Sequence, residues 1–269
     1  AAKFCRLLGM KYGVYVRGYG SYKKYGNNKS ENKEELNDSF ILSNAKFLIT
    51  VSPKLKKDLE IFNNRVSILR PMLSYNLEDI FTNKSFPSFS NNIELLFVGS
   101  VSERKGIYEI CDVVKILEKK INIKVNIIGD GPILQRLIDK QNRGEISNNI
   151  LFRESISDKN ELMEEYKKAD ALFLPTRNEG FPRVLYEAML AKLPIFVTFV
   201  SGISGTMNPN YNCIEIPVND PEGQADAILR GINNPELLEK IAENGVKTVT
   251  DVITNRNPHH EVLIDCIKN

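Results

Sequence analysis

Residues 179–187 read EGFPRVLYE and closely follow the apolar stretch 172–174. The pattern predicts a strand, a turn of small residues and a helix with Pro182 at its first position, where the missing N–H is tolerated. Glu179 lies in the turn, and Glu187 lies about one and a half turns into the helix. Such a turn directs unpaired helix N–H groups and the positive end of the helix dipole at one point. Two carboxylates beside that point predict a site for a phosphorylated sugar.

The sequence on both sides of this segment alternates between strand-like and helix-like patterns from residue 93 onward. Apolar runs predict strands at residues 94–98, 124–128, 150–152, 170–175, 194–200 and 213–216. Apolar residues at helical spacing predict helices that include residues 107–117, 133–138, 158–166, 182–191, 225–229 and 237–242. This alternation is typical of a doubly wound parallel sheet, whose ligands bind at the carboxyl ends of the strands. We therefore expect residues 87–269 to form one complete Rossmann-like domain.

Residues 1–86 contain fewer elements. Strands are predicted at residues 12–17, 47–52 and 66–69, with helices near residues 34–43 and 53–62. Three strands are too few for a full domain of ~100–150 residues, and the chain begins with Ala1 rather than Met. We therefore expect a partial first domain, and we expect the start of the native protein to be missing. Residues 71–92 are rich in Asn, Ser and Pro, which predicts the connection between the two domains.

The stretch 179–187 resembles the paired-glutamate signature of the family 4 retaining glycosyltransferases. The resemblance covers roughly residues 47–249 and is strongest over residues 179–198. It implies an α/β chain of the GT-B type, with a complete Rossmann-like donor-binding domain preceded by a partial Rossmann-like acceptor domain. It also implies that Glu179 holds the transferred sugar or assists departure of the diphosphate, and that Glu187 binds the ribose. The alternative is that Glu187 is an exposed helix residue and Glu179 only stabilises the helix N-terminus.

The turn between the two glutamates differs from the common Gly-Phe-Gly of that family, because Pro182 replaces the second glycine. Proline cannot donate a backbone hydrogen bond. The backbone N–H groups of Gly180, Phe181 and Arg183 remain as predicted donors to sugar hydroxyls or phosphate.

A second stretch, residues 98–106 with the sequence VGSVSERKG, resembles the family loop in which an Arg and a Lys neutralise the donor diphosphate. Lys105 and the glycine after it match the Lys-Gly pair of that loop, and we predict Lys105 and Glu179 as the catalytic residues. Gly99 and Ser100 open the loop, but Ser100 stands where many members have Arg. Arg104 is the candidate to replace that missing cation. Positive side chains and a helix N-terminus can balance the charge of a leaving diphosphate without a metal.

Residues 129–132, GDGP, follow a strand and open a helix. They resemble the family's Gly-x-Gly-Pro turn near the nucleotide, which implies that Gly129 and Gly131 contact the donor. A tight turn that needs glycine for a positive φ explains the same residues at least as well.

An acceptor-side residue is implied near the start of the chain. Residues 15–20 read YVRGYG and resemble the family turn that often carries a His before the Gly, where this chain has Arg17. Arg17 is suited to an anionic acceptor or the donor phosphate, and a purely structural turn is the alternative.

The net charge of +2 hides an asymmetry, because residues 1–86 hold 15 Lys and Arg against 8 Asp and Glu. A basic first portion is suited to an anionic membrane surface or a lipid-phosphate acceptor. A solvated helix face around Lys54, Lys56 and Lys57 explains the charges equally well. No apolar run approaches the ~20 residues of a membrane span.

Several patterns are absent from the sequence. There is no Asp-x-Asp, and the two histidines, His259 and His260, are adjacent, so neither a metal site nor a Ser-His-Asp triad is predicted. Neither G-x-G-x-x-G nor a P-loop motif occurs, which argues against NAD and P-loop sites. The four cysteines are far apart, which favours a reducing compartment.

These patterns and the resemblance together predict a retaining glycosyltransferase. Its donor substrate is a UDP- or GDP-linked sugar, it needs no cofactor, and it transfers a hexosyl unit to a glycan or lipid-linked acceptor in bacterial surface polysaccharide synthesis. We expect a cytoplasmic protein, with peripheral contact to the inner face of the membrane through the basic first portion, and no nucleic-acid partner. The alternatives are a non-catalytic nucleotide-sugar-binding module and a nucleotide-sugar epimerase of the same fold.

Overall fold

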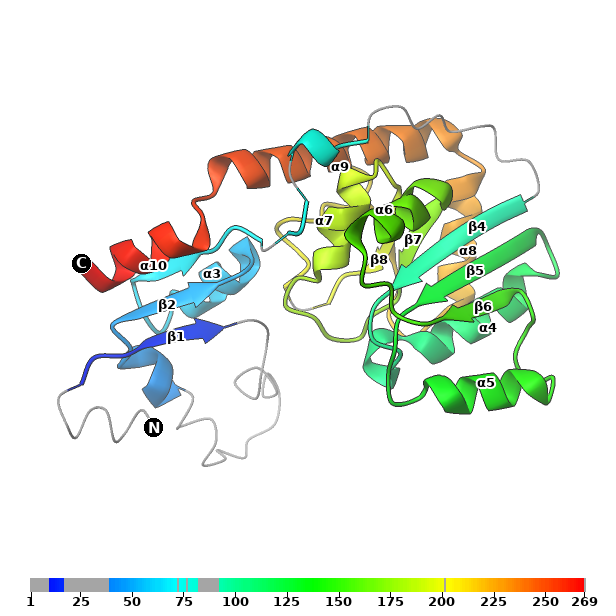
Figure 1. Cartoon of the computed structure of the whole chain (residues 1–269), viewed down its shortest axis with the longest axis horizontal. Coiled ribbons are helices and arrows are strands. Elements are labelled where there is room, and N and C mark those ends of the chain that lie inside the picture. The colour runs from blue at the N-terminus through cyan, green and yellow to red at the C-terminus, as the bar shows by residue number, and fades with distance from the viewer. Residues whose placement is uncertain are drawn as a thin grey trace.

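The structure is a computed structural model that describes residues 10–16, 39–71, 73–75, 77–81, 92–200 and 202–268. It contains two parallel sheets, one of three strands and one of six (Figure 1). The elements of the first sheet are β1 (Gly13–Val16), β2 (Phe47–Thr50), α3 (Pro53–Leu59) and β3 (Val66–Ile68), followed by the short helix η2 (Leu77–Asp79). The predicted boundary between residues 86 and 87 lies outside the described residues, so the division of the chain stays a prediction.

The second sheet follows in chain order. Its elements are β4 (Asn92–Val98), η3 (Glu103–Lys105), α4 (Ile107–Leu117), β5 (Asn122–Ile128), α5 (Leu134–Asn142), β6 (Ile150–Arg153), α6 (Lys159–Lys168), β7 (Ala171–Leu174), α7 (Arg183–Leu190), β8 (Ile195–Thr198), β9 (Ile214–Ile216), α8 (Pro221–Ile232), α9 (Pro235–Asn255) and α10 (His259–Lys268). The strand order β6-β5-β4-β7-β8-β9 is the 3-2-1-4-5-6 order of a Rossmann fold. This order confirms the predicted doubly wound sheet.

The core of the larger sheet explains why its strands read as unbroken apolar runs. All four residues of β7 and of β8 are buried, as expected for a parallel sheet with helices on both faces. Helix α4 packs against α8, and α7 packs against α9, on this sheet. Asp158 opens α6 as predicted, because its carboxylate accepts hydrogen bonds from the N–H groups of Asn160 and Glu161.

The end of the chain differs from the prediction. The helix expected over residues 237–242 is the 21-residue helix α9, and α10 was not predicted. Residues 246–254 read VKTVTDVIT, whose β-branched side chains disfavour a helix locally, so burial of Val249, Val252 and Ile253 in the core overrides the local preference. Helix α10 then packs on the first sheet, where Val262 and Cys266 form a small core with Ile49 and Leu69.

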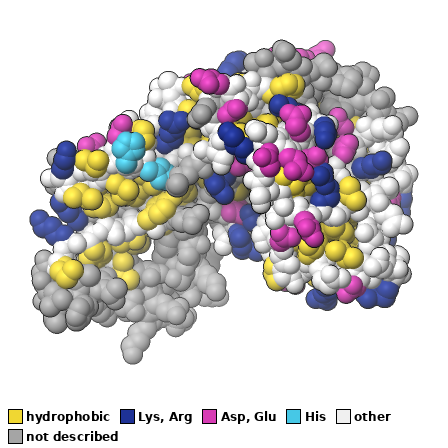
Figure 2. All heavy atoms as spheres, in the orientation of Figure 1, with side chains coloured by type: hydrophobic (Ala, Val, Ile, Leu, Met, Phe, Trp, Pro, Cys, Tyr) yellow, Lys and Arg dark blue, Asp and Glu magenta, His cyan; other side chains and the backbone are white. Residues whose placement is uncertain are grey.

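The face of the molecule drawn in Figure 2 differs in side-chain type between the two sheets. Apolar side chains gather over α10 and the first sheet, whereas positive and negative side chains are mixed over the elements of the larger sheet. On α3, Lys54 pairs with Asp58 at 2.8 Å and Lys56 with Glu60 at 3.8 Å, the pattern of a solvated helix face. Among the described residues, no helix is both long enough and apolar enough to cross a membrane.

Candidate functional site

The site lies where the chain direction across the larger sheet reverses. Strands β4 and β7 are neighbours, but the chain proceeds from β4 toward one edge and from β7 toward the other. The loops at the carboxyl ends of two such strands separate and form a ligand crevice. Both predicted motifs lie in these loops: η3 follows β4, and the glutamate turn follows β7.

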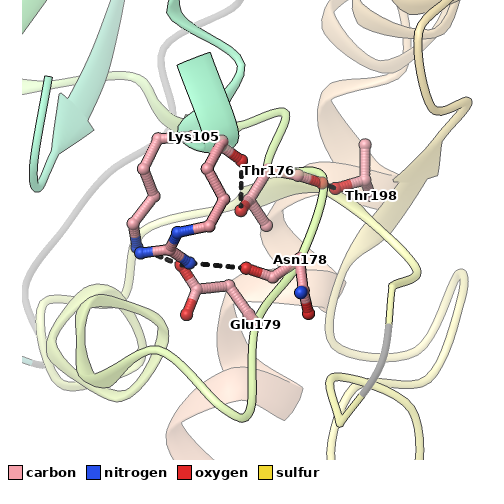
Figure 3. A network of polar contacts seen from close by, with 6 residues as sticks. Lys105, Thr176, Asn178, Glu179 and Thr198 are labelled. Atoms are coloured by element: carbon pink, nitrogen blue, oxygen red, sulfur yellow. Dashed lines mark hydrogen bonds and ion pairs between the residues drawn. The ribbon is translucent and has the colours of Figure 1, made fainter. Parts of the chain in front are cut away.

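Two cations from the first loop meet one carboxylate from the second. Lys105 Nζ forms an ion pair with Glu179 Oε1, and Arg104 Nη1 lies 3.2 Å from the same oxygen. The side chains of Lys105 and Glu179 are each 12% exposed, and that of Arg104 is 53% exposed. Figure 3 shows Lys105 and Glu179 directed at each other across the two loops. The predicted catalytic pair is therefore adjacent in the structure, and Arg104 joins it.

Backbone hydrogen bonds hold the two loops together beneath these side chains. The carbonyl oxygen of Arg104 accepts from the N–H of Arg177 at 2.9 Å and from the hydroxyl of Thr176 at 3.3 Å. The hydroxyl of Thr198, at the end of β8, donates in turn to the carbonyl oxygen of Thr176 (Figure 3). Three strand ends thus fix the loop that carries Glu179.

Two further features bring the loops close. Gly106 has φ +75°, and a Cβ there would lie 2.1 Å from the carbonyl oxygen of Pro175, so only glycine fits behind Lys105. Arg177 also binds the buried carboxylate of Glu109 on α4, with Nε 2.6 Å from Oε1. This second ion pair ties the glutamate turn to the helix that follows η3.

Helix α7 begins one residue later than predicted. Pro182 has ψ 132° and is the N-cap, so the first helical residue is Arg183. Proline has no side-chain acceptor, and no side chain caps this helix among the described residues. Within the described residues, the N–H groups of Gly180, Phe181 and Arg183 also make no backbone hydrogen bond. Over the part of the chain that the structure describes, the start of α7 therefore has backbone donors without a backbone acceptor, which is the arrangement that an anion site requires.

Glu187 lies in a different setting on the same helix. It is partly buried, and its Oε2 accepts a hydrogen bond of 2.8 Å from the hydroxyl of Tyr166 on α6. Burial raises the pKa of Glu187 above its ordinary value, while the Tyr166 hydrogen bond and the charge of Arg183 lower the pKa. The alternative of an exposed helix residue is therefore wrong for Glu187. Its role in binding a ligand stays a prediction.

Phe181 and Arg183 flank Pro182 with opposite orientations. The Phe181 ring packs against Tyr186, with ring centroids 4.6 Å apart. The ring is partly buried and packs against the core of the larger sheet. Arg183 is exposed at the start of α7.

The glycines after β4 and β5 form a packed turn. Gly129 has φ +147°, and a Cβ there would lie 2.1 Å from the carbonyl oxygen of Gly99. A Cβ on Gly131 would lie 2.2 Å from the carbonyl oxygen of Val101. The positive φ that the tight-turn explanation requires is therefore present at Gly129, whereas Gly131 is required by close backbone packing. The predicted contact of both glycines with a donor stays a prediction. Ser100 is exposed beside them, and Arg17 lies outside the described residues.

Three residues near the site were not predicted from the sequence: Tyr166, Thr176 and Thr198. Each acts through a contact between distant segments, which no local motif encodes. Taken together, the site has two cations and a helix N-terminus that suit a diphosphate, and a partly buried carboxylate that suits hydroxyl groups.

Comparison with known proteins places this geometry in context. The family model described as "Glycosyl transferases group 1" matches residues 79–248. An uncharacterized glycosyltransferase of Methanocaldococcus jannaschii is 29% identical over 210 residues, which are 77% of this chain and 55% of that protein. The capsular polysaccharide biosynthesis glycosyltransferase CapM of Staphylococcus aureus is 26% identical over 170 residues, 62% of this chain and 44% of CapM.

Solved structures show the same architecture. HepE of Anabaena in complex with UDP superposes with a TM-score of 0.73 at 15% identity, covering 99% of this chain and 74% of HepE. This likeness shows the GT-B fold that the sequence predicted. The chain spans about half the length of the curated relatives it matches, 55% for each of the first two.

Proposed function

Because the chain belongs to the glycosyl transferases group 1 family, we propose that it transfers a hexosyl unit from a UDP- or GDP-linked sugar to a glycan or lipid-linked acceptor, with retention at the anomeric carbon. One observation carries the proposal. Lys105 and Arg104 meet Glu179 at the point where the strand order reverses, beside the uncapped start of α7. Cations and a helix N-terminus at that place are suited to a sugar diphosphate.

The proposed reaction assigns a role to each end of the glutamate motif. Lys105, Arg104 and the start of α7 balance the charge that develops on the departing diphosphate. Glu179 contacts the transferred sugar, and Glu187 accepts hydrogen bonds from the ribose hydroxyls. The bond between the anomeric carbon and the diphosphate oxygen breaks, and the acceptor oxygen bonds the same face of the sugar. The acceptor proton leaves with the nucleoside diphosphate.

The setting is also part of the proposal. CapM is named for capsular polysaccharide biosynthesis, and HepE was solved with UDP. These names support a surface-polysaccharide acceptor and favour uracil over guanine as the base. Cys111, Cys213 and Cys266 are free thiols, which supports a reducing, cytoplasmic compartment. Peripheral membrane contact through the basic first portion remains part of the same proposal.

The first test is calorimetric titration of the protein with UDP, GDP and their glucose conjugates. We expect one nucleotide to bind, and Glu187→Ala to weaken it about tenfold or more, since a hydrogen bond to a charged group contributes roughly 1.5–3 kcal/mol. Glu179→Gln is the matched comparison, because it changes a carboxylate of the same motif that is assigned to the sugar rather than the nucleoside, and it should not weaken nucleotide binding. Absence of binding to every nucleotide would overturn the proposal.

A second measurement separates transfer from the alternatives. The protein is incubated with the donor sugar, with and without a membrane extract that supplies acceptors, and the products are identified by mass spectrometry. A sugar adduct that forms only with the extract supports a transferase. An epimerised donor formed without the extract indicates an epimerase, and bound but unchanged donor in both samples indicates a binding module.

A further inference from the structure

The carboxylate of Glu187 is held by one buried phenol. Tyr166 is 0% exposed, and its hydroxyl donates to Glu187 Oε2 at 2.8 Å. Among the described residues, this is the only hydrogen bond that the Glu187 carboxylate makes. Oε1 is not among the buried polar atoms that lack a partner, and the residue is partly exposed. One oxygen is therefore fixed inside the protein, and the other is available to solvent or a ligand.

We propose that Tyr166 is a positioning residue for donor binding, which fixes Oε2 of Glu187 so that Oε1 is presented to a pair of ligand hydroxyls. The proposal rests on the proposed function, in which those hydroxyls belong to the ribose of the nucleotide. It adds a residue on α6, outside the motif that runs from residue 179 to residue 187. Tyr166 itself need not touch the ligand.

The physical reason is that a glutamate side chain has several rotatable bonds, whose freedom opposes binding. A phenol that is packed in the core cannot move with the carboxylate, so a single short bond selects one orientation before the ligand arrives. Preorganised polar groups bind more tightly than groups that must be ordered on binding. The hydrogen bond also stabilises the charged carboxylate in a place where burial disfavours charge.

Among the described residues, Tyr166 on α6 contacts this carboxylate directly. The charge of Arg183 on α7 also lowers the pKa of Glu187, and the charge of Glu187 in turn raises the pKa of Tyr75 in the connection between the two sheets. Burial raises the pKa of Glu187, and the hydrogen bond from Tyr166 is the largest influence that lowers it. Removing the phenol should therefore raise the pKa of Glu187 further. Arg183 continues to lower that pKa in such a variant.

Tyr75 provides a matched control. It is also buried, at 4% exposed, and burial followed by the charge of Glu187 raises its pKa to about 12. Its hydroxyl, however, donates to the backbone carbonyl of Lys159 at 2.7 Å rather than to the carboxylate. Tyr75→Phe thus removes a buried phenol whose pKa responds to the charge of Glu187, without removing the contact that the proposal requires.

The test compares the wild type, Tyr166→Phe, Tyr75→Phe, Glu187→Gln and the double variant Tyr166→Phe/Glu187→Gln. UDP affinity is measured by calorimetry, and the pKa of Glu187 by ¹³C NMR of its carboxyl carbon. We expect Tyr166→Phe to weaken UDP binding about tenfold, as the loss of a charge-assisted hydrogen bond does, and to raise the pKa of Glu187. Tyr75→Phe should change UDP affinity by less than about twofold, and the double variant should bind UDP like Glu187→Gln alone.

Equal losses of UDP affinity in Tyr166→Phe and Tyr75→Phe would show that Tyr166 acts through packing. A further loss of affinity in the double variant, relative to Glu187→Gln alone, would show the same. An unchanged pKa of Glu187 in Tyr166→Phe would refute the hydrogen bond. If the wild type binds UDP and Tyr166→Phe binds it equally well, the positioning role fails while the proposed function stands. If the wild type binds neither UDP nor GDP, the proposed function fails and this inference fails with it.

Discussion

The two ends of the glutamate motif have the same side chain and opposite surroundings. The Glu179 carboxylate is held by Lys105 and Arg104, which come from a loop at another strand end. The Glu187 carboxylate is held by a neutral phenol between two helices. Two cations balance the charge of the Glu179 carboxylate, whereas the Glu187 carboxylate is held by a hydrogen bond from an uncharged group. The two ends of the motif therefore lie in two chemical settings: Glu179 shares two cations that a phosphate could also bind, and Glu187 is an anion that could accept hydrogen bonds from hydroxyl groups.

The largest effect should come from the Glu179 end. Replacing Lys105 by Met removes the less exposed of the two cations and leaves Glu179 at the proposed phosphate site with Arg104 as its remaining ion-pair partner among the described residues. We expect UDP affinity to fall about 30-fold, because a hydrogen bond to a charged group contributes roughly 2 kcal/mol. Uridine, which has no phosphate, should bind as it does to the wild type. Calorimetry with UDP and uridine checks both expectations.

The double variant Lys105→Met/Glu179→Gln is the control for this prediction. Removing the carboxylate as well removes its repulsion of the phosphate, so part of the lost UDP affinity should return. If Lys105→Met weakens uridine as strongly as UDP, the division of the motif into a phosphate end and a nucleoside end is wrong.

A middle-sized effect concerns stability at the Glu187 end. Because burial raises the pKa of Glu187 above its ordinary 4.5, the folded state binds this proton more tightly than the unfolded state. This difference in proton binding stabilises the folded state at pH values below the ordinary pKa. The stabilisation is lost as pH rises through the pKa that Glu187 has in the folded state. At pH 7 the charged carboxylate of Glu187 therefore destabilises the folded state. Glu187→Gln should raise Tm by about 2–4 °C, which corresponds to a gain of ~1 kcal/mol in the free energy of unfolding.

The advantage of Glu187→Gln should disappear below about pH 4, where the wild-type carboxyl is neutral in both states. Thermal melts at pH 4 and pH 7 measure this difference. A Tm that falls in Glu187→Gln at pH 7 would mean that the hydrogen bond from Tyr166 outweighs the cost of burial. A more stable variant that binds UDP less well would identify Glu187 as a residue kept for function at the expense of stability.

The two ends of the motif also differ in how far the sequence predicts their contacts. The contact between Lys105 and Glu179 was predictable, because both follow strands of one parallel sheet and carboxyl ends of such strands meet at one edge. The hydrogen bond from Tyr166 to Glu187 was not, because it depends on how α6 packs beside α7. Helix α10 was missed for a similar reason: its place is set by contacts with Ile49 and Leu69, about two hundred residues earlier in the chain.

The smallest effect should come from the second cation of the Glu179 end. Arg104 lies 3.2 Å from Glu179 Oε1, but its side chain is 53% exposed against 12% for Lys105. Water and salt screen an exposed charge strongly. Arg104→Ala should therefore weaken UDP binding by no more than about threefold at low salt, and the difference should vanish at higher ionic strength. Calorimetric titrations with UDP at two salt concentrations measure this difference in affinity. Lys105→Met is the reference variant, because its loss of UDP affinity should persist at the higher salt concentration. A loss in Arg104→Ala as large and as salt-resistant as that of Lys105→Met would mean that Arg104 is drawn into the site when the phosphate binds. It would then replace the arginine that is absent at Ser100.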